Sequence, residues 1–154
     1  MKINIGINTE SRKTLADALS KLLADSYTLY LKTHNFHWNV TGPNFASLHT
    51  LFESEYVELA DAVDDIAERI RTLDVPAPGS YQQFLALTCI KEETGVPSAS
   101  DMIAQLVKDH EAVSKTAHDV LKVAQKIEDE VTVALATDRM TVHEKTAWML
   151  RSMV

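Results

Sequence analysis

The most informative stretch of the chain is an acidic segment in its first half. Between positions 53 and 68 it holds no lysine or arginine but the carboxylates of Glu53, Glu55, Glu58, Asp61, Asp64, Asp65 and Glu68. Like charges one helical turn apart repel each other, so a solvated helix face usually interleaves basic residues with acidic ones. A bound cation would supply the missing positive charge, whereas the simpler alternative is an acidic surface without a ligand.

Helical spacing places one imidazole and three of these carboxylates on a single stripe. Steps of three or four residues connect His49, Glu53, Val57, Ala60, Asp64 and Glu68. His49 and Glu53 are four residues apart, as are Asp64 and Glu68, so that each pair can bind one ion. His37 lies on the inward face of the preceding helical segment. Imidazole together with carboxylate suits Fe(II), Mn(II) or Zn(II) better than Ca(II) or Cu(I).

One chain cannot bring both pairs to the same ion. His49 and Asp64 are fifteen residues apart, which is about 22 Å along an α-helix. The stripe is symmetric in position, because 49 with 68, 53 with 64 and 57 with 60 share one midpoint. A second copy packed antiparallel about a two-fold axis at Val57 and Ala60 would bring the first pair next to the second pair of the partner subunit. The sequence therefore predicts two identical metal sites per dimer.

Helices must position these residues, and the apolar periodicity is helical almost throughout. We expect long helices over about residues 9–39, 45–73 and 98–127 and a fourth after residue 130, with a short helix over 81–87. Glycine and proline, four of each, gather mainly in the connections, as expected for residues that break helices. Two short loops and one long one between four helices indicate an all-α four-helix bundle with a long crossover, in one domain over residues 1–154.

The arrangement of histidines argues against a metal centre inside one chain. The usual ferritin-like bundle uses Glu-x-x-His motifs on two of its helices for such a centre. None of the six histidines here has a glutamate three residues before it. A metal site of this protein is therefore expected between subunits.

Several stretches of the chain resemble the Dps family of mini-ferritins: His34–Gly42, Phe45, Leu48–His49, Asp64–Ile70 and His143–Leu150. The resemblance covers nearly the whole chain and implies a ferritin-like fold, assembled through two-fold dimers into a hollow dodecamer. It also implies a ferroxidase that oxidises Fe(II), preferentially with hydrogen peroxide, and stores ferric mineral inside the shell. Such an activity would protect the cell from oxidative damage under stress.

The resemblance also implies the ligands of this centre. Carried over by position, they are His37, His49 and Glu53 of one subunit with Asp64 and Glu68 of its partner. Together they would hold two ferrous ions per site, and zinc can occupy sites of this kind. Many members have aspartate in place of Glu53, so the longer side chain is a departure.

Iron must also enter a shell, and in the family acidic residues near the start of the last helix line pores. The candidates here are Asp129, Glu130 and Asp138, although the Thr-Ala-Asp-Leu of many members reads Thr132-Val133-Ala134-Leu135. His34 is either a packed histidine or a neighbour of the site, and Trp38 either flanks the site or packs in the core. We interpret His110, His118 and His143 as structural and Cys89, in the long loop, as a residue without a role.

The net charge, the cysteine count and the lack of long apolar runs limit the partners and locations that we expect for this protein. The formal net charge is −7 and there is one cysteine, so non-specific binding to nucleic acid, an intrachain disulfide and a multi-cysteine zinc site are not expected. No apolar run suits a membrane span or a signal peptide, which favours the cytoplasm or its nucleoid. DNA binding should be weak or absent, because only Lys2, Arg12 and Lys13 precede Leu15. The alternative function is that of a non-enzymatic, nucleoid-binding structural protein whose acidic face serves only assembly.

Overall fold

A computed structural model describes all 154 residues as five helices without a strand. The helices are α1 (Thr9–Asn39), α2 (Phe45–Thr72), α3 (Tyr81–Leu87), α4 (Ala99–Ile127) and α5 (Glu130–Arg151). These bounds agree with the expected helices to within two residues, and the short helix lies inside the long connection as predicted. No helix has the length and apolar character that crossing a membrane requires.

Local sequence signals explain where the helices begin and turn. Asn8, Ser80 and Ser98 each precede a helix, and each side chain accepts a hydrogen bond from the backbone N–H three residues later. Such caps satisfy N–H groups that have no partner within the helix. Gly42 has a φ of +115° in the turn between α1 and α2, a conformation that a side chain would disfavour.

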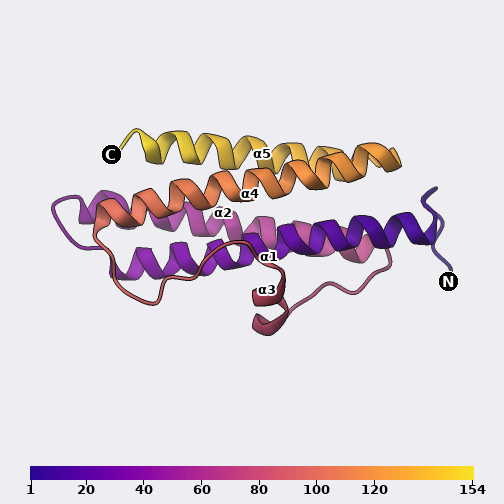
Figure 1. Cartoon of the computed structure of the whole chain (residues 1–154), viewed down its shortest axis with the longest axis horizontal. Coiled ribbons are helices and arrows are strands. Elements are labelled where there is room, and N and C mark those ends of the chain that lie inside the picture. The colour runs from indigo at the N-terminus through magenta and orange to yellow at the C-terminus, as the bar shows by residue number, and fades with distance from the viewer.

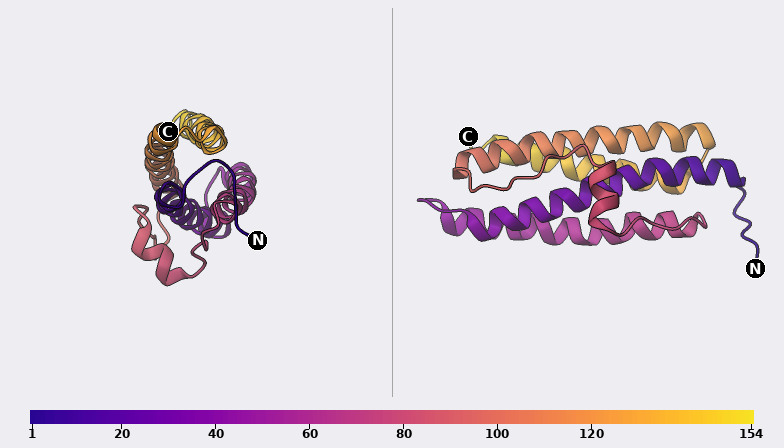
Figure 2. Two further views of the ribbon diagram at one scale, coloured as in Figure 1. Left: turned by 90° about the vertical axis from the view of Figure 1, so that its right-hand side faces the viewer. Right: turned by 60° about the horizontal axis from the view of Figure 1, so that its bottom comes forward.

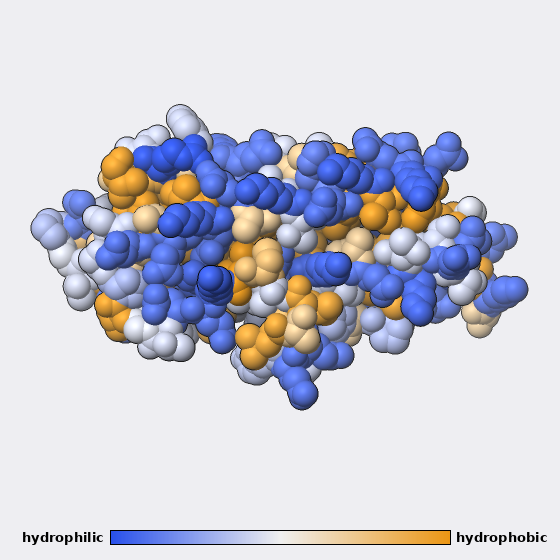
Figure 3. Space-filling view, viewed as in Figure 1, coloured by the Kyte–Doolittle hydropathy of each residue, from blue (hydrophilic) through white to orange (hydrophobic).

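The four long helices form two hairpins that pack lengthwise (Figure 1). Helix α1 pairs with α2, α4 pairs with α5, and the hairpins meet mainly where α1 packs against α4. The connection from α2 to α4 runs along the outside of α1 and carries α3 there (Figure 2). Apolar side chains reach the surface over α3 (Figure 3), where Tyr81 and Leu85 are exposed. The fold is thus an all-α bundle with a long crossover.

Most of the core comes from α1, α2 and α4. Its fully buried side chains include Leu15, Leu19, Leu22, Leu29, Phe36, Phe52, Leu59, Ile66, Leu106 and Val113. Helix α5 differs, because half of its buried residues are polar: Thr132, Ala136, Arg139, His143, Ala147 and Leu150. The apolar residues pack, and the polar ones require partners inside the bundle.

Helices α2 and α5 are joined by ion pairs more than by apolar packing. Near one end, Arg69 Nη2 lies 2.6 Å from Asp129 Oδ2, and Arg69 Nε donates to the Thr132 hydroxyl at 2.9 Å. Nearer the middle, Arg139 on α5 pairs with both carboxylate oxygens of Glu58 on α2. A bidentate arginine–carboxylate pair fixes geometry as well as charge, so these contacts set the position of α5 over α2.

Candidate metal centre

Two candidate ligands, His37 and His49, meet across the turn between α1 and α2. His37 Nδ1 lies 2.7 Å from the backbone oxygen of His49, and His49 Nδ1 lies 2.8 Å from the backbone oxygen of His37. Their rings stack with centroids 3.8 Å apart and planes inclined by 15°. A carbonyl oxygen can only accept, so both Nδ1 atoms carry a proton. In the neutral rings both Nε2 atoms therefore keep a free lone pair, the tautomer that binds a metal ion.

Aromatic side chains fix the orientation of these rings. Phe45 stacks on His49 with centroids 5.1 Å apart, and Tyr56 meets the edge of His37 at 5.1 Å. His34 lies between Tyr56 at 4.1 Å and Trp38 at 3.9 Å, and its pKa is lowered by burial and by the nearby His37. Trp38 is 58% exposed, so it flanks the histidines and does not belong to the core. Sequence reasoning missed Phe45 and Tyr56 in this role, although helical spacing from His49 could have indicated both.

The remaining candidate ligands follow α2 along a face that the chain itself leaves open. Glu53, Asp64 and Glu68 are exposed, as are the small residues between them, with Val57 at 50%. The neighbouring stripe of Leu48, Phe52 and Leu59 is fully buried, as expected. None of the three carboxylates forms an ion pair within the chain. An acidic face with neither a basic partner nor a covering helix is suited to a second copy of the chain or to cations.

No group of three His, Cys, Asp or Glu side chains within the chain is close enough to hold a metal ion. The structure brings His37 and His49 together. It does not bring Asp64 and Glu68 to these histidines, because both carboxylates lie farther along α2 than His49 does. This separation is what the length of α2 requires, because the two pairs are about four helical turns apart. One chain therefore holds two incomplete sets of candidate ligands and no complete set.

The suggested pore residues divide into two kinds. Asp129 is buried and accepts hydrogen bonds from Arg69 and Thr132, and these bonds lower its pKa although burial opposes them. It therefore joins α5 to α2, and its carboxylate could line a pore only if these bonds were broken. Glu130 and Asp138 are exposed near the start of α5, where they stay candidates.

A second polar cluster lies inside the bundle, where the sequence indicated only structural histidines. Arg139 Nη2 lies 3.0 Å from His143 Nε2, and His143 Nδ1 lies 2.8 Å from His110 Nδ1. His110 Nε2 in turn lies 3.9 Å from Glu55 Oε2, and neither of these two atoms has a hydrogen-bond partner. Burial raises the pKa of Glu55 to about 8, lowers that of His110 to about 3 and lowers that of His143 well below its usual value. Both histidines are therefore neutral.

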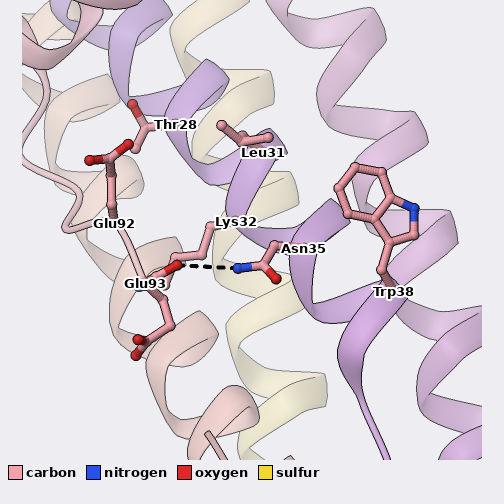
Figure 4. Close-up of a pocket in the computed structure, with 7 residues that line it drawn as sticks. All are labelled: Thr28, Leu31, Lys32, Asn35, Trp38, Glu92 and Glu93. Atoms are coloured by element: carbon pink, nitrogen blue, oxygen red, sulfur yellow. Dashed lines mark hydrogen bonds between the residues drawn. The ribbon is translucent and has the colours of Figure 1, made fainter. Parts of the chain in front are cut away.

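Another hollow lies between α1 and the segment that follows α3 (Figure 4). Its basic side chain is already paired: Lys32 Nζ lies 2.7 Å from Asp109 Oδ2 and donates to the Lys91 carbonyl at 3.0 Å. Asn35 Nδ2 donates to the Glu93 carbonyl at 3.2 Å, the bond drawn in Figure 4. These bonds attach the crossover to α1. The hollow contains no candidate ligand.

Comparison with known proteins agrees with this architecture. The family described as a ferritin-like domain matches residues 16–154. A low-temperature-induced protein of Nostoc is 44% identical over 99% of this chain and 87% of its own length. A DNA protection during starvation protein of Helicobacter pylori is 36% identical over 88% of this chain and 95% of its own length.

A solved structure gives the same result in three dimensions. The Dps protein of Vibrio cholerae, described as a member of a broad superfamily of ferritin-like diiron-carboxylate proteins, superposes with a TM-score of 0.94 at 34% identity. The match covers 99% of this chain and 97% of that one. The fold, the matched family and these relatives agree with the resemblance read from the sequence. This chain belongs to the Dps family of ferritin-like proteins.

Proposed function

We propose that this protein is a ferroxidase that binds Fe(II) between two subunits, oxidises it with hydrogen peroxide and stores the ferric product in a hollow oligomer. The observation that carries the proposal is the pair His37 and His49, whose Nε2 atoms are free to ligate beside the open acidic face of α2. Glu53 would complete this half of the site. Asp64 and Glu68 of the partner subunit would supply the other half.

The donor set fits the proposed reaction. Oxidation of two ferrous ions by one peroxide consumes two protons, giving two ferric ions and two water molecules. Carboxylates stabilise the harder ferric ion more than the ferrous ion, so Glu53, Asp64 and Glu68 would favour the oxidised product. The two imidazoles would hold the incoming Fe(II) in place, because their rings are fixed by the backbone bonds and by Phe45 before any ion arrives.

Saturable Fe(II) binding followed by fast oxidation on addition of peroxide is the expected result of an anaerobic titration. DNA should be poorly retained in a gel-shift assay at physiological salt, because the net charge is −7 and few basic residues could release counterions. The alternative, a structural protein of the nucleoid, requires the opposite pair of results. Absence of both tight Fe(II) sites and peroxide-driven oxidation would contradict the proposed function.

The proposed dimer axis passes between Val57 and Ala60, where the exposed side chains are small. Ala60→Trp should therefore overfill the interface, at a cost of about 1–3 kcal/mol per site before any rearrangement. Size-exclusion chromatography should show smaller species for this variant. Ala60→Ser, which keeps the side chain small, is the matched control and should assemble like the parent. An unchanged oligomer of Ala60→Trp would place the axis elsewhere.

A further inference from the structure

All four tyrosines of the chain lie in one row of aromatic side chains that begins at the candidate metal centre. They are Tyr27, Tyr30, Tyr56 and Tyr81. Tyr27 and Tyr30 belong to α1, Tyr56 belongs to α2, and Tyr81 is the first residue of α3. Helices α2 and α3 both pack on α1 (Figure 2). Three separate elements therefore bring tyrosine side chains together along α1.

The rings of this row follow one another without a gap. The ring of Tyr56 meets that of His37 with centroids 5.1 Å apart and that of Tyr30 with centroids 6.1 Å apart. Tyr27 continues the row, with its centroid 5.7 Å from that of Tyr30 and 6.3 Å from that of Tyr81. All of these separations fall within about 4.5–7 Å, the range of aromatic pairs in contact. The row is thus continuous from a candidate ligand to α3.

The phenol groups of the row influence one another. Burial and the nearby Tyr81 and Tyr30 raise the pKa of Tyr27. Burial, Glu53 and Tyr30 raise the pKa of Tyr56. Tyr27 and Tyr56 therefore keep their phenolic protons at neutral pH, and each has another phenol close by.

The two ends of the row differ in their access to solvent. Tyr56, Tyr30 and Tyr27 are half-buried between the helices, whereas Tyr81 is 67% exposed. The half-buried end lies beside His37, which is one of the candidate iron ligands. The row therefore connects the histidine half of the proposed site with the surface of α3.

Phenols donate single electrons to strong oxidants only. An Fe(II) that meets peroxide without a second Fe(II) beside it gives Fe(III), hydroxide and a hydroxyl radical. This radical takes a hydrogen atom from a phenol, which gives water and a phenoxyl radical. Peroxide that is reduced by two Fe(II) together forms no such radical, so the tyrosines stay unreacted in complete turnover.

We propose that the four tyrosines form a relay that carries a single oxidising equivalent from the histidine half of the ferroxidase site to the surface of α3. A hydroxyl radical formed at the site takes a hydrogen atom from Tyr56. One electron and one proton then pass from Tyr30 to Tyr56 and, in the same way, from Tyr27 to Tyr30. The last transfer, from Tyr81 to Tyr27, leaves the radical at the surface. A small one-electron reductant in solution, such as ascorbate, returns a hydrogen atom to Tyr81.

The relay rests on the proposed function, which supplies the iron and the peroxide, and its test locates the radical. The parent oligomer receives one Fe(II) per chain and then peroxide, in the presence of a nitrone spin trap, and mass spectrometry of its peptides locates the trapped radical. We expect the label at Tyr81, and ascorbate should abolish it. Tyr30→Phe keeps the ring but removes the oxidisable phenol. The label at Tyr81 should then be lost, oxidation products should accumulate at Tyr56 and His37, and the rate of Fe(II) oxidation should stay that of the parent.

Two further variants complete the experiment. Tyr27→Phe interrupts the row one step later and should cause the same loss of label at Tyr81, so it decides the question if Tyr30→Phe does not assemble. Trp148→Phe is the matched control, because it removes an aromatic side chain of α5 that is 61% exposed and lies outside the row. This control should leave the label at Tyr81 unchanged.

Three results would overturn the relay. Label at Tyr81 that survives both Tyr30→Phe and Tyr27→Phe would show that radicals reach this residue through solvent. A parent that oxidises Fe(II) but acquires no label at Tyr81 would show that oxidising equivalents do not leave by this row, and would not affect the proposed function. A parent that oxidises no Fe(II) would contradict the proposed function itself, and the relay with it.

Discussion

Two variants that are each unable to oxidise Fe(II) should regain the activity when they assemble into one oligomer. The first lacks His49 and Glu53, the second lacks Asp64 and Glu68, and in each homo-oligomer every proposed site is half empty. A mixed dimer has one site without any of the four groups and one with all of them. Random pairing of equal amounts makes half of the dimers mixed, so about a quarter of the parent's peroxide-driven Fe(II) oxidation should return.

The matched control for this experiment is Asp61→Asn with Asp65→Asn. Both residues are exposed on α2 outside the stripe, so this variant has a similar change of charge and should stay active alone. A site contained in one chain could never be restored by mixing, because each chain would carry its own defect. Verified co-assembly without recovery of oxidation would therefore contradict the shared site.

Glu55→Gln should remove a pH dependence of stability that the parent shows. Burial raises the pKa of Glu55 from an ordinary 4.5 to about 8, so the folded chain binds this proton more tightly than the unfolded chain does. This proton therefore contributes to the free energy of unfolding. The contribution is complete below about pH 4.5 and is lost as pH rises toward 8, at about 1.4 kcal/mol per pH unit. Glutamine has nearly the same shape and no charge, so its stability should change less over this window.

Urea unfolding at several pH values and one fixed protein concentration measures this difference. Between pH 5 and pH 8 the free energy of unfolding of Glu55→Gln should rise steadily relative to that of the parent. At about 1.4 kcal/mol per pH unit, the difference should change by several kcal/mol in total. Glu92→Gln, at an exposed glutamate in the crossover, is the control and should follow the parent. Equal slopes for the parent and Glu55→Gln would show that the buried carboxyl is ionised in the folded chain.

The elements that depend on local signals could be predicted from the sequence. The helices follow from apolar periodicity, and the separation of the stripe through His49 from the one through Phe52 follows from helical geometry alone. The acidic face of α2 can therefore be recognised from residue spacing. Whether a partner subunit covers it stays a prediction, because that depends on contacts between chains.

The interior cluster could not be predicted, because its members are far apart in sequence and individually unremarkable. His110 and Arg139 lie on different helices, and each reads as a core position or a surface charge when taken alone. Their roles depend on which rotamers face each other across the bundle, and on the guanidinium of Arg139, which can only donate and so fixes the direction of the hydrogen bonds between the two neutral imidazoles. For the same reason the sequence alone does not reveal that Asp129 is buried beside Arg69.

Because of the reciprocal hydrogen bonds between His37 and His49, these two side chains become ordered when the chain folds and not when an ion binds. Each ring is fixed by the other residue's backbone oxygen in the folded chain, so the rotamer entropy of both side chains is lost during folding. Ordering a free side chain at the moment of binding would cost about 0.5–1.5 kcal/mol each. An ion that binds here as proposed would not bear that cost, and its affinity for these two nitrogens would reflect bonding and desolvation with little conformational loss.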